Sequence, residues 1–534
     1  MEKRLVLAFV LSCFVFALWG VLNPPPKRPV RQPEKTQQIA NKQDTERPPA
    51  RPIKPAAIPT TSKVNENIRS LENDFLKAEF SNIGGSLRRL WVKPYNSTIP
   101  VTDIMAITDF AQQPFDMESI SADTIVYRME ADGMTIRKKY RLAGEYLIEA
   151  SVEVTNNTEM SKQNNIQIQP FSLDVSSLDK NIENPRDTQL DEYSIATDEK
   201  TFRKGGATKF SAKEKTDQFK SVKWVGFRDR YFCLVFKPQY HVDEYRVDPV
   251  SEKMIILDTL INGSEIYPQA TKEINAIIYM GPQQLSQLKS YNMGFEEIMV
   301  FSNWAPLDWV AKLIYGLMNI LHRFIPNWGI CIIIISLIIY GAMYPLTFKG
   351  MMSMKKMQAV QPRLAQLRDK YKDNPQKLNK EMLDLYREHK INPLGGCFPL
   401  ILQMPVFIGL YQVLWRTVEF KGAGFLWIKD LSSPDRLVTF PFSLPVIGNE
   451  LNILPLIMIV VMAMQQRITA KNMVITDPAQ VTQQKIMQTF FPFFIGFIFY
   501  KFASGLSLYF TIFYSLSTLT QWQMSKVKTD FVSK

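Results

Sequence analysis

The sequence predicts a polytopic α-helical membrane protein with six spans. A five-span core with a cytoplasmic helical hairpin follows a large all-β domain. Three observations predict this class. Uncharged apolar stretches close to the length of a bilayer crossing occur at residues 5–22 and again after residue 327. Between them, residues 67–290 contain short runs of alternating apolar and polar residues. A basic polar segment, residues 349–392, separates two of the apolar stretches.

The basic segment sets the orientation of the chain. It contains eleven Lys and Arg but only five Asp and Glu, and short loops rich in Lys and Arg stay on the cytoplasmic side of a membrane. The flanking spans, Trp328–Leu346 and Cys397–Trp415, are therefore expected to run in opposite directions. Cytoplasmic loops also explain the net charge of +12 better than a nucleic-acid partner does, so no nucleic-acid specificity is predicted.

Residues 1–22 are predicted to be a transmembrane anchor. The stretch 5–22 is uncharged over 18 residues and follows Lys3 and Arg4, which places the N-terminus in the cytoplasm. A cleaved signal peptide is the alternative, but the sequence around Leu18 does not resemble a cleavage site. Residues 23–66 are predicted to be a disordered linker, because ten of the chain's 33 prolines lie within 23–62.

Residues 67–290 are predicted to form a β-sandwich. Because the first span starts in the cytoplasm, the domain after it is expected on the other side, in the periplasm of a two-membrane cell. The polar stretch Ser176–Lys220 is expected to be a long loop or an excursion from the sandwich. Half-buried strands are expected where apolar residues alternate: Phe75–Phe80, Met134–Leu142, Tyr146–Val154, Trp224–Phe236 and Ile274–Tyr279.

Residues 302–325 are predicted to be an amphipathic helix that lies in the membrane interface. Apolar residues recur there at helical spacing. Trp304 and Trp309 are expected at headgroup depth. Charged and titratable residues disfavour a crossing: Asp308, Lys312, His322 and Arg323.

The core, residues 326–525, is predicted to contain five spans and is followed by a basic cytoplasmic tail, residues 526–534. Besides the two spans named above, uncharged runs occupy Leu451–Gln466, Ile486–Tyr500 and Phe502–Ser525. The first two of these runs contain 16 and 15 residues. At ~1.5 Å per residue they fall short of a hydrocarbon core of roughly 30 Å, so they are expected to thin the bilayer locally.

The chain lacks the residue patterns of an enzyme, and no cofactor or metal is predicted. Its three histidines, at 241, 322 and 389, are far apart in the sequence, which argues against a His-based metal site or nucleophile. Its four cysteines have no metal-binding spacing. Phosphate-binding loops and G-x-S-x-G motifs are also missing from the sequence.

Polar side chains inside the predicted spans are the first candidates for a functional site, because such residues face a bundle interior or water. Two interpretations remain open. The residues form hydrogen bonds between helices, each worth about 1 kcal/mol, or they line a polar cavity. The candidates are Ser336, Tyr340, Gln403, Ser507, Tyr509 and Thr511.

The basic segment is predicted to fold as a helical hairpin. Apolar residues recur at helical spacing from Met354 to Tyr371 and again from Leu378 to His389. Asn374 is expected to cap the second helix, with Pro375 at its first position. The alternative is a solvated loop that only determines topology.

Four short motifs resemble those of one membrane protein family. They are Met343–Thr347, Asn392–Pro399, Gln403–Pro405 and Ser504–Leu506. In their order along the chain, together with the anchor, linker, β domain and interfacial helix, they resemble the YidC membrane protein insertases, bacterial relatives of the mitochondrial Oxa and chloroplast Albino proteins. The resemblance covers the whole chain, and the long periplasmic domain resembles the Gram-negative form.

This resemblance implies a periplasmic β-supersandwich and an insertase core with a hydrophilic groove open to the cytoplasm and to lipid. It implies a membrane protein insertase and chaperone that inserts and folds nascent integral membrane proteins in the bacterial inner membrane, alone or with the Sec translocon. No ATP hydrolysis is needed, because burial of a client's own roughly 20 apolar residues drives the transfer.

The resemblance also implies partners. They are nascent membrane proteins, the Sec translocon, the ribosome, components of the signal recognition particle pathway and membrane lipids. The hairpin would then contact clients or the ribosome through basic residues and adaptable methionines. The residues expected to do so are Met354, Lys355, Lys356, Met357, Arg363, Lys377, Lys380 and Arg387.

One position departs from the family pattern. Family members usually carry an arginine in the groove where this chain has Tyr340, although a tyrosine hydroxyl can still donate a hydrogen bond there. The main alternative function is a solute transporter or channel, but the five spans show no inverted repeat. An anchored mutarotase-like domain is a second alternative, and fold alone does not support it.

Overall fold

The computed structural model of the protein describes residues 66–98, 101–163, 166–174, 191–205, 217–242, 244–251, 254–260, 265–371, 374–389, 391, 398–444, 448–471 and 478–526. The predicted anchor, nearly all of the predicted linker, the tail after Lys526 and residues 392–397 of the third-span motif lie outside the described residues. Apart from the start of one helix, α10, the described residues belong to one compact unit.

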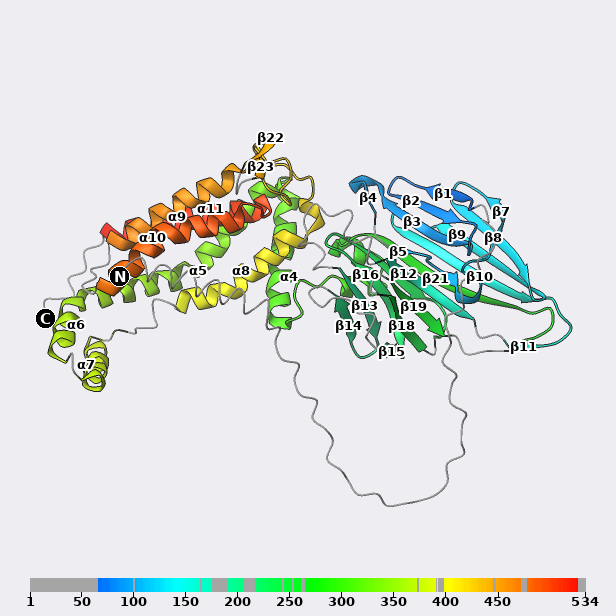
Figure 1. Cartoon of the computed structure of the whole chain (residues 1–534), viewed down its shortest axis with the longest axis horizontal. Helices are drawn as coiled ribbons and strands as arrows, with labels where there is room; N and C mark the ends of the chain where they lie inside the picture. The colour runs from blue at the N-terminus through cyan, green and yellow to red at the C-terminus, as the bar shows by residue number, and fades with distance from the viewer. Residues whose placement is uncertain are drawn as a thin grey trace, which may run out of the picture. The chain divides into compact units, whose positions relative to one another are not determined.

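The β-rich part contains a nine-stranded antiparallel sheet with the order β14-β13-β16-β17-β21-β10-β9-β8-β7 (Figure 1). Strands β9 and β10 bury every second residue, as β9 does from Met134 to Tyr140, whereas β17 and β21 are buried over most of their length. The strands are β7 (Asp116–Ile120), β8 (Thr124–Ala131), β9 (Met134–Leu142), β10 (Leu147–Asn156), β13 (Glu192–Thr197), β14 (Thr201–Gly205), β16 (Val222–Arg228), β17 (Phe232–Pro238) and β21 (Thr271–Pro282).

A four-stranded sheet, β1-β2-β3-β4, packs on this large sheet. The rings of Phe80 on β2 and Tyr140 on β9 lie 4.9 Å apart, and the Tyr140 hydroxyl donates to the Gly85 carbonyl at 2.8 Å. The strands are β1 (Ile68–Glu72), β2 (Leu76–Ser81), β3 (Ser86–Val92) and β4 (Ser97–Thr98).

A six-stranded sheet has the order β15-β18-β19-β12-β5, with β6 also paired to β12, and β11 pairs with β20. The strands are β5 (Val101–Thr102), β6 (Ala106–Ile107), β11 (Lys162–Gln163), β12 (Gln167–Asp174), β15 (Asp217–Phe219), β18 (Glu244–Ser251), β19 (Met254–Leu260) and β20 (Glu265–Ile266). The short helices of this part are η1 (Lys93–Tyr95), η2 (Thr108–Phe110), α3 (Leu285–Ser290) and η4 (Phe295–Ile298).

The predicted β-rich region is confirmed, with two corrections. Trp224–Phe236 is not one run, because a turn at residues 229–231 separates β16 from β17. The prediction of a long loop at Ser176–Lys220 is wrong where the structure describes it, since β13, β14 and β15 lie there. Strand β13 lies within this polar stretch, but its own apolar residues Tyr193, Ile195 and Ala196 are buried, which suits a strand on a packed sheet.

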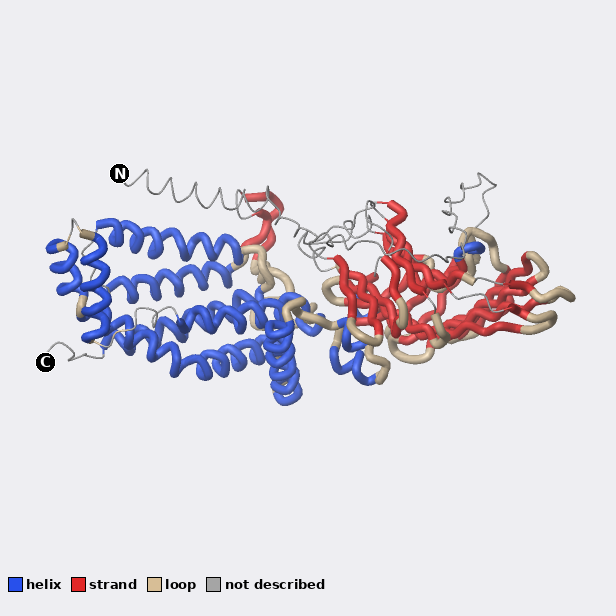
Figure 2. The backbone as a smooth tube through the Cα atoms, turned by 90° about the horizontal axis from the view of Figure 1, so that it is seen from below, coloured by secondary structure: helices blue, strands red, loops and turns tan. Residues whose placement is uncertain are grey.

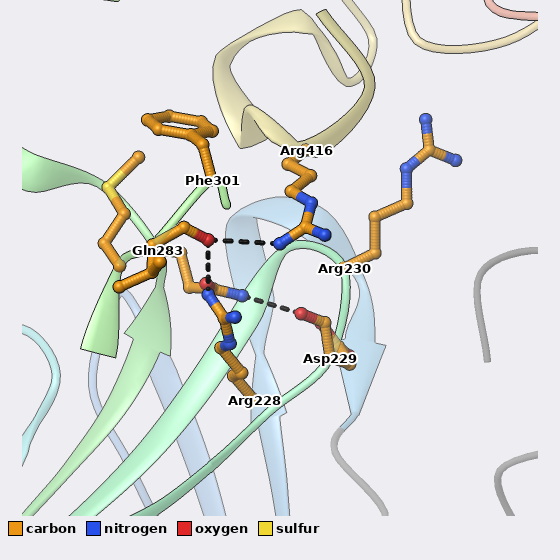
Figure 3. Close-up of a pocket in the computed structure, with 8 residues that line it drawn as sticks. Arg228, Asp229, Arg230, Gln283, Phe301 and Arg416 are labelled. Atoms are coloured by element: carbon orange, nitrogen blue, oxygen red, sulfur yellow. Dashed lines mark hydrogen bonds between the residues drawn. The ribbon is translucent and has the colours of Figure 1, made fainter. Parts of the chain in front are cut away.

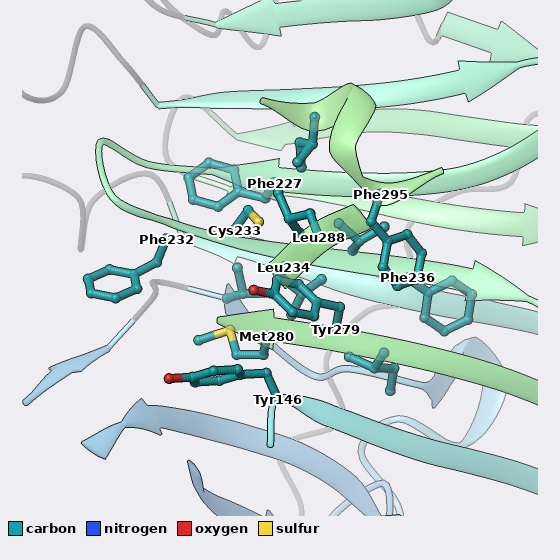
Figure 4. Close-up of a cluster of buried hydrophobic side chains, with 14 of the residues drawn as sticks. Tyr146, Phe227, Phe232, Cys233, Leu234, Phe236, Tyr279, Met280, Leu288 and Phe295 are labelled. Carbon is teal, nitrogen blue, oxygen red and sulfur yellow. The ribbon is translucent and has the colours of Figure 1, made fainter. Parts of the chain in front are cut away.

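The β-rich part has an aromatic core between β17, β21 and the short helices α3 and η4 (Figure 4). Tyr279 on β21 contacts the rings of Tyr291 and Phe295 at 5.6 and 6.0 Å. Its hydroxyl donates to the Pro282 carbonyl at 2.7 Å. These contacts hold the residues that follow β21 against the nine-stranded sheet.

The helical part follows (Figures 1 and 2). Helices α5, α8, α9, α10 and α11 run side by side, and α4 lies across one end of them in both views. The bounds are α4 (Ala305–Phe324), α5 (Trp328–Ala359), α6 (Gln361–Lys370), α7 (Pro375–Glu388), α8 (Phe398–Arg416), η6 (Val418–Phe420), α9 (Ile453–Lys471), α10 (Pro478–Phe499) and α11 (Ser504–Lys526), with the hairpin β22 (Val438–Leu444) and β23 (Gly448–Leu451) before α9.

Helix α5 extends beyond the predicted second span. It continues through Pro345 to Ala359, so eleven residues of the basic segment prolong the span instead of forming a separate hairpin helix. The residues from Met351 to Met357 are mostly good helix formers. The break comes at Val360, directly before α6, which carries Pro362 in its first turn.

Of the described helices, α5 alone is long and apolar enough to cross a membrane by length and composition, over Trp328–Met357. Two shorter apolar segments, Ile453–Thr469 and Gln488–Phe499, lie in α9 and α10. Both helices are longer than the predicted runs, with 19 and 22 residues, because polar residues continue the helix at one end.

Helix α4 occupies the predicted amphipathic segment. It buries Leu307, Ala311 and Ile314 and packs on α8. Its opposite face leaves large apolar residues exposed, including both predicted tryptophans: Trp304, Trp309, Leu313, Leu317, Ile320 and Phe324.

Candidate functional site

The predicted polar residues of α5 face the interior of the helical part. Ser336 is fully buried and donates to the Ile332 carbonyl of its own helix at 2.5 Å. Tyr340 is 8% exposed, and its hydroxyl donates to Thr520 Oγ1 of α11 at 2.7 Å, with the Leu516 carbonyl oxygen 3.3 Å away. Tyr340 therefore joins α5 to α11 by side-chain hydrogen bonding.

The predicted polar residues of α11 are buried near its start. Thr511 donates to the Ser507 carbonyl at 2.8 Å. The Ser507 hydroxyl and the Tyr509 hydroxyl are buried and have no hydrogen-bond partner among the described residues. Gln403 of α8 is half-buried and lies near the Tyr509 hydroxyl. An unpaired polar group in a dry interior is costly, so these hydroxyls point to a wetter environment.

Two polar contacts that the sequence analysis missed extend this set along α11. Gln465 of α9 donates to Ser517 at 2.7 Å. Thr469 of α9 lies 2.6 Å from Gln521 Oε1 and donates to it. Like the contact from Tyr340 to Thr520, they involve the second half of α11. Their only sequence signal was polar residues at helical spacing near the end of the last span.

The predicted helical hairpin is present, with its second helix capped as expected. The Asn374 side chain accepts from the Lys377 backbone N–H at 3.1 Å, and Pro375 begins α7. Leu364 of α6 and Leu385 of α7 form a small apolar cluster with Val360 and Ile391. Such a small core gives the hairpin little stability of its own.

The structure divides the predicted hairpin contact residues into two groups. Met354, Lys355, Lys356 and Met357 are half-buried in the last turns of α5. The Lys355 ammonium donates to the Met524 carbonyl at the end of α11, which complements the dipole of that helix. The other group is exposed on α6 and α7 and consists of Arg363, Lys377, Lys380 and Arg387.

Three arginines lie where the β-rich part meets the helical part (Figure 3). Arg228 at the end of β16 and Arg416 at the end of α8 both donate to the Val300 carbonyl, at 2.9 and 3.1 Å. Arg230 donates to the Trp415 carbonyl at 2.7 Å. Arg228 also forms an ion pair with Glu192, with 3.1 Å between Arg228 Nη2 and Glu192 Oε1. The cavity between these residues has a volume of about 10 Å³, which is room for one water molecule.

This arrangement offers polar groups that can bind and position a partner. Among the described residues, no group of three or more His, Cys, Asp or Glu could hold a metal ion. The two described cysteines, Cys233 and Cys331, are buried. Polar groups placed between helices can instead hydrogen-bond water or a polypeptide segment.

Comparisons with known families match most of the chain. The family described as "YidC periplasmic domain" matches residues 106–317. The family described as "60Kd inner membrane protein" matches residues 320–530. The first match covers most of the β-rich part and α4, and the second covers α5 to α11.

Curated relatives carry one shared name. A protein from Janthinobacterium sp. (strain Marseille), named "Membrane protein insertase YidC", is 30% identical over 506 residues, which is 88% of this chain and 86% of the relative. Relatives of the same name from Herminiimonas arsenicoxydans and Pelobacter propionicus are 31% and 29% identical. The match to the Herminiimonas protein covers 77% of this chain and 70% of that relative. The match to the Pelobacter protein covers 99% of this chain and 100% of that relative.

Two solved structures illustrate the structural comparison. A YidC insertase crystal structure with the first transmembrane domain resolved is 18% identical, covers 87% of this chain and 95% of its own, and has a TM-score of 0.36. A galactose mutarotase related enzyme from Lactobacillus acidophilus is 9% identical, covers 40% of this chain and 97% of its own, and has a TM-score of 0.31. Scores this low do not by themselves establish a shared fold.

Proposed function

Because the chain belongs to the YidC family of membrane protein insertases, we propose that it inserts and folds nascent integral membrane proteins in the bacterial inner membrane. Such a protein must lower the free-energy barrier for moving polar segments of a client across the hydrocarbon of the membrane. Burial of the client's own apolar segment supplies the driving force, so the proposed activity needs no ATP hydrolysis, cofactor or metal.

We propose six spans, namely the anchor at 1–22 and helices α5, α8, α9, α10 and α11. Both termini then lie in the cytoplasm and the β-rich domain in the periplasm. The outward faces of the helices support a lipid environment, because they expose large apolar side chains that a water-soluble bundle would bury. These include Leu337, Leu402, Leu456, Val460, Phe493, Phe497 and Leu519.

A hydrophilic groove along α11 is the proposed client site, formed by the residues predicted above and the further polar residues of α9 and α11. The observation that carries it is the set of buried side-chain atoms without a partner: Ser507 Oγ, Tyr509 OH and, on α8, Gln412 Oε1. In hydrocarbon such atoms need water or a bound segment to satisfy them. The polar contacts of Tyr340, Gln465 and Thr469 extend the same lining toward the other end of α11.

We further propose that the hairpin α6–α7 contacts the ribosome, the signal recognition particle pathway or the client itself. Its exposed basic residues and the methionines at the end of α5 suit such a surface. Its small apolar core allows it to move. The Sec translocon is a proposed partner for larger clients, and the apolar outer faces of the helices are surfaces on which another membrane protein could pack.

Site-specific photo-crosslinking tests the groove. A crosslinker at Tyr340, Gln403 or Tyr509 is expected to capture stalled nascent chains that carry one apolar segment. Leu337 and Leu456, which are exposed on α5 and α9, are the matched controls and should give mainly lipid adducts. Crosslinks to the client at the control positions alone would contradict the groove.

A solute transporter or channel remains the alternative function. It would use the same polar residues to bind a small solute near the bilayer midplane. Solute flux through reconstituted protein, in the absence of any client insertion, would favour this alternative.

A further inference from the structure

A buried carboxyl group lies where α4 meets the end of α8, in a place that the proposed insertion activity does not use. Glu419 belongs to η6, the short turn after α8. The Tyr315 hydroxyl of α4 donates to Glu419 Oε1 at 2.5 Å. The neighbouring side chains of Val418 and Phe420 are fully buried, and the Phe420 ring meets the Trp328 ring of α5 at 5.1 Å.

The second oxygen of this carboxyl, Oε2, is buried and has no hydrogen-bond partner among the described residues. The titratable groups facing the carboxyl are two tyrosines, Tyr315 of α4 and Tyr95 of η1. Two residues further along the chain, the Lys421 ammonium donates to Ser97 Oγ at 3.0 Å and lies over the rings of Tyr231 and Phe232.

The remaining titratable group nearby is His322 of α4. Its ring stacks on the Trp328 ring at 3.9 Å between centroids. Burial lowers the pKa of His322. Any pH measurement on this region must therefore distinguish the titration of His322 from that of the Glu419 carboxyl.

The two protonation states of Glu419 have different costs. The carboxylate form would be a buried charge that is stabilised only by hydrogen bonds from the Tyr315 hydroxyl and from the backbone N–H of Glu419. The neutral acid would leave only its hydroxyl without a partner among the described residues, which is the smaller penalty. Burial accordingly raises the pKa of Glu419 from 4.5 to about 7, while the Tyr315 hydrogen bond lowers it by a smaller amount. Burial and the Glu419 charge raise the pKa of Tyr315, so Tyr315 stays the donor.

We propose that Glu419 is a proton-binding site that couples the packing of α4 on the end of α8 to the pH on that side of the membrane. The folded-state pKa lies above the unfolded value. The stabilising contribution is therefore complete below about pH 4.5 and is lost as the pH rises through about 7. With the topology proposed above, an acidified periplasm holds α4 in place, and a neutral to alkaline one loosens it.

Infrared difference spectroscopy on the full-length protein in nanodiscs tests proton binding without any client. Between about pH 6 and about pH 8, a unit on each side of the midpoint, the wild type is expected to lose a protonated-carboxyl band that Glu419→Gln lacks. Tyr315→Phe removes a hydrogen bond that favours the ionised form, so the same band should persist to higher pH. A band that is unchanged in Glu419→Gln overturns the proposal.

Hydrogen exchange of α4 peptides tests the mechanical consequence. After correction for the intrinsic pH dependence of exchange, α4 of the wild type should exchange roughly tenfold faster at about pH 8 than at about pH 6, since one pKa unit corresponds to a factor of ten. Glu419→Gln should remove this pH dependence. His322→Gln is the matched control and should retain it; its loss there would assign the effect to the histidine and overturn the proposal. Both measurements can fail while insertion activity persists.

Discussion

Tyr340 of α5 and Thr520 of α11 are joined by a hydrogen bond of 2.7 Å, although 180 positions separate them in the chain. The bond ties together two of the proposed spans. Tyr340 is thus a neutral donor whose hydroxyl is already engaged by a neighbouring helix.

Tyr340→Phe is expected to lower stability in detergent or nanodiscs by about 1 kcal/mol, because a hydrogen bond between membrane helices is worth about that much. Thermal unfolding followed by circular dichroism measures this. Tyr344→Phe, one turn further along α5 at a more exposed tyrosine, is the control and should leave the midpoint unchanged. Equal midpoints for both variants would show that the Tyr340 bond contributes nothing.

Tyr340→Arg tests the missing charge directly. An arginine at this position would place a permanent positive charge in the proposed groove. The yield of inserted clients with acidic tails is expected to rise relative to clients with neutral tails. An unchanged ratio would mean that charge in the groove is dispensable in this protein.

The buried pair of Arg228 and Glu192 should be more important for stability than the surface pair of Arg137 and Glu118. Arg228→Ala leaves the buried Glu192 carboxylate with only the longer ion pair to Arg203, at 3.7 Å, and removes donors from the Ile298 and Val300 carbonyls. A loss of about 3 kcal/mol, at the low end for breaking a buried pair, is expected. Arg137→Ala, at a side chain that is 47% exposed, should cost at most about 1 kcal/mol. Urea unfolding of the full-length protein measures both.

Lys138 should make the stability of the β-rich part depend on pH. It occupies an apolar position of β9 and donates to the Gly84 and Met105 carbonyls at 2.7 and 2.9 Å. Burial lowers its pKa from 10.5 to about 7. The unfolded chain therefore binds more protons between these values, and stability should rise as the pH increases from about 7 to about 10.

Lys138→Met should flatten that rise, because methionine does not titrate. Lys139→Met is the matched control, since Lys139 is the exposed neighbour on the same strand, and it should keep the wild-type slope. Unfolding by urea at a series of pH values measures all three proteins. A slope in Lys138→Met equal to that of the wild type would contradict the assignment.

The exposed basic residues of the hairpin should strengthen ribosome binding. Changing Arg363, Lys377, Lys380 and Arg387 together to Gln is expected to weaken cosedimentation with ribosomes and to reduce its dependence on salt. The control changes four exposed basic residues of the β-rich part to Gln, namely Arg89, Arg128, Lys139 and Arg141. If both variants bind equally well, the hairpin is not the docking surface.

Local sequence patterns predicted much of the fold because the relevant interactions are local. The alternation from Met134 to Leu142 gave strand β9 with those bounds, and Asn374 followed by Pro375 gave the start of α7. The extension of α5 to Ala359 was not predicted, because the predicted span ended where the charged segment begins, although the helix propensity of the residues continues beyond that point.

The site residues were only partly predictable, because their partners are distant in the chain. Tyr340 was identified from its place in an apolar helix, but nothing in the sequence indicated Thr520 as its partner. Glu419 was missed altogether, since its burial depends on Tyr315, 104 positions away. The arginines at 228 and 416 meet at Val300 only after the β-rich part and α8 have been assembled.

Client insertion by the purified protein tests the central claim most directly. The full-length protein is reconstituted into liposomes, and a small client with one or two spans is added without ATP or any other nucleotide. We predict that the client becomes protected from external protease to a greater extent than in protein-free liposomes. Equal protection in the two preparations would contradict the assignment of insertase activity to this chain.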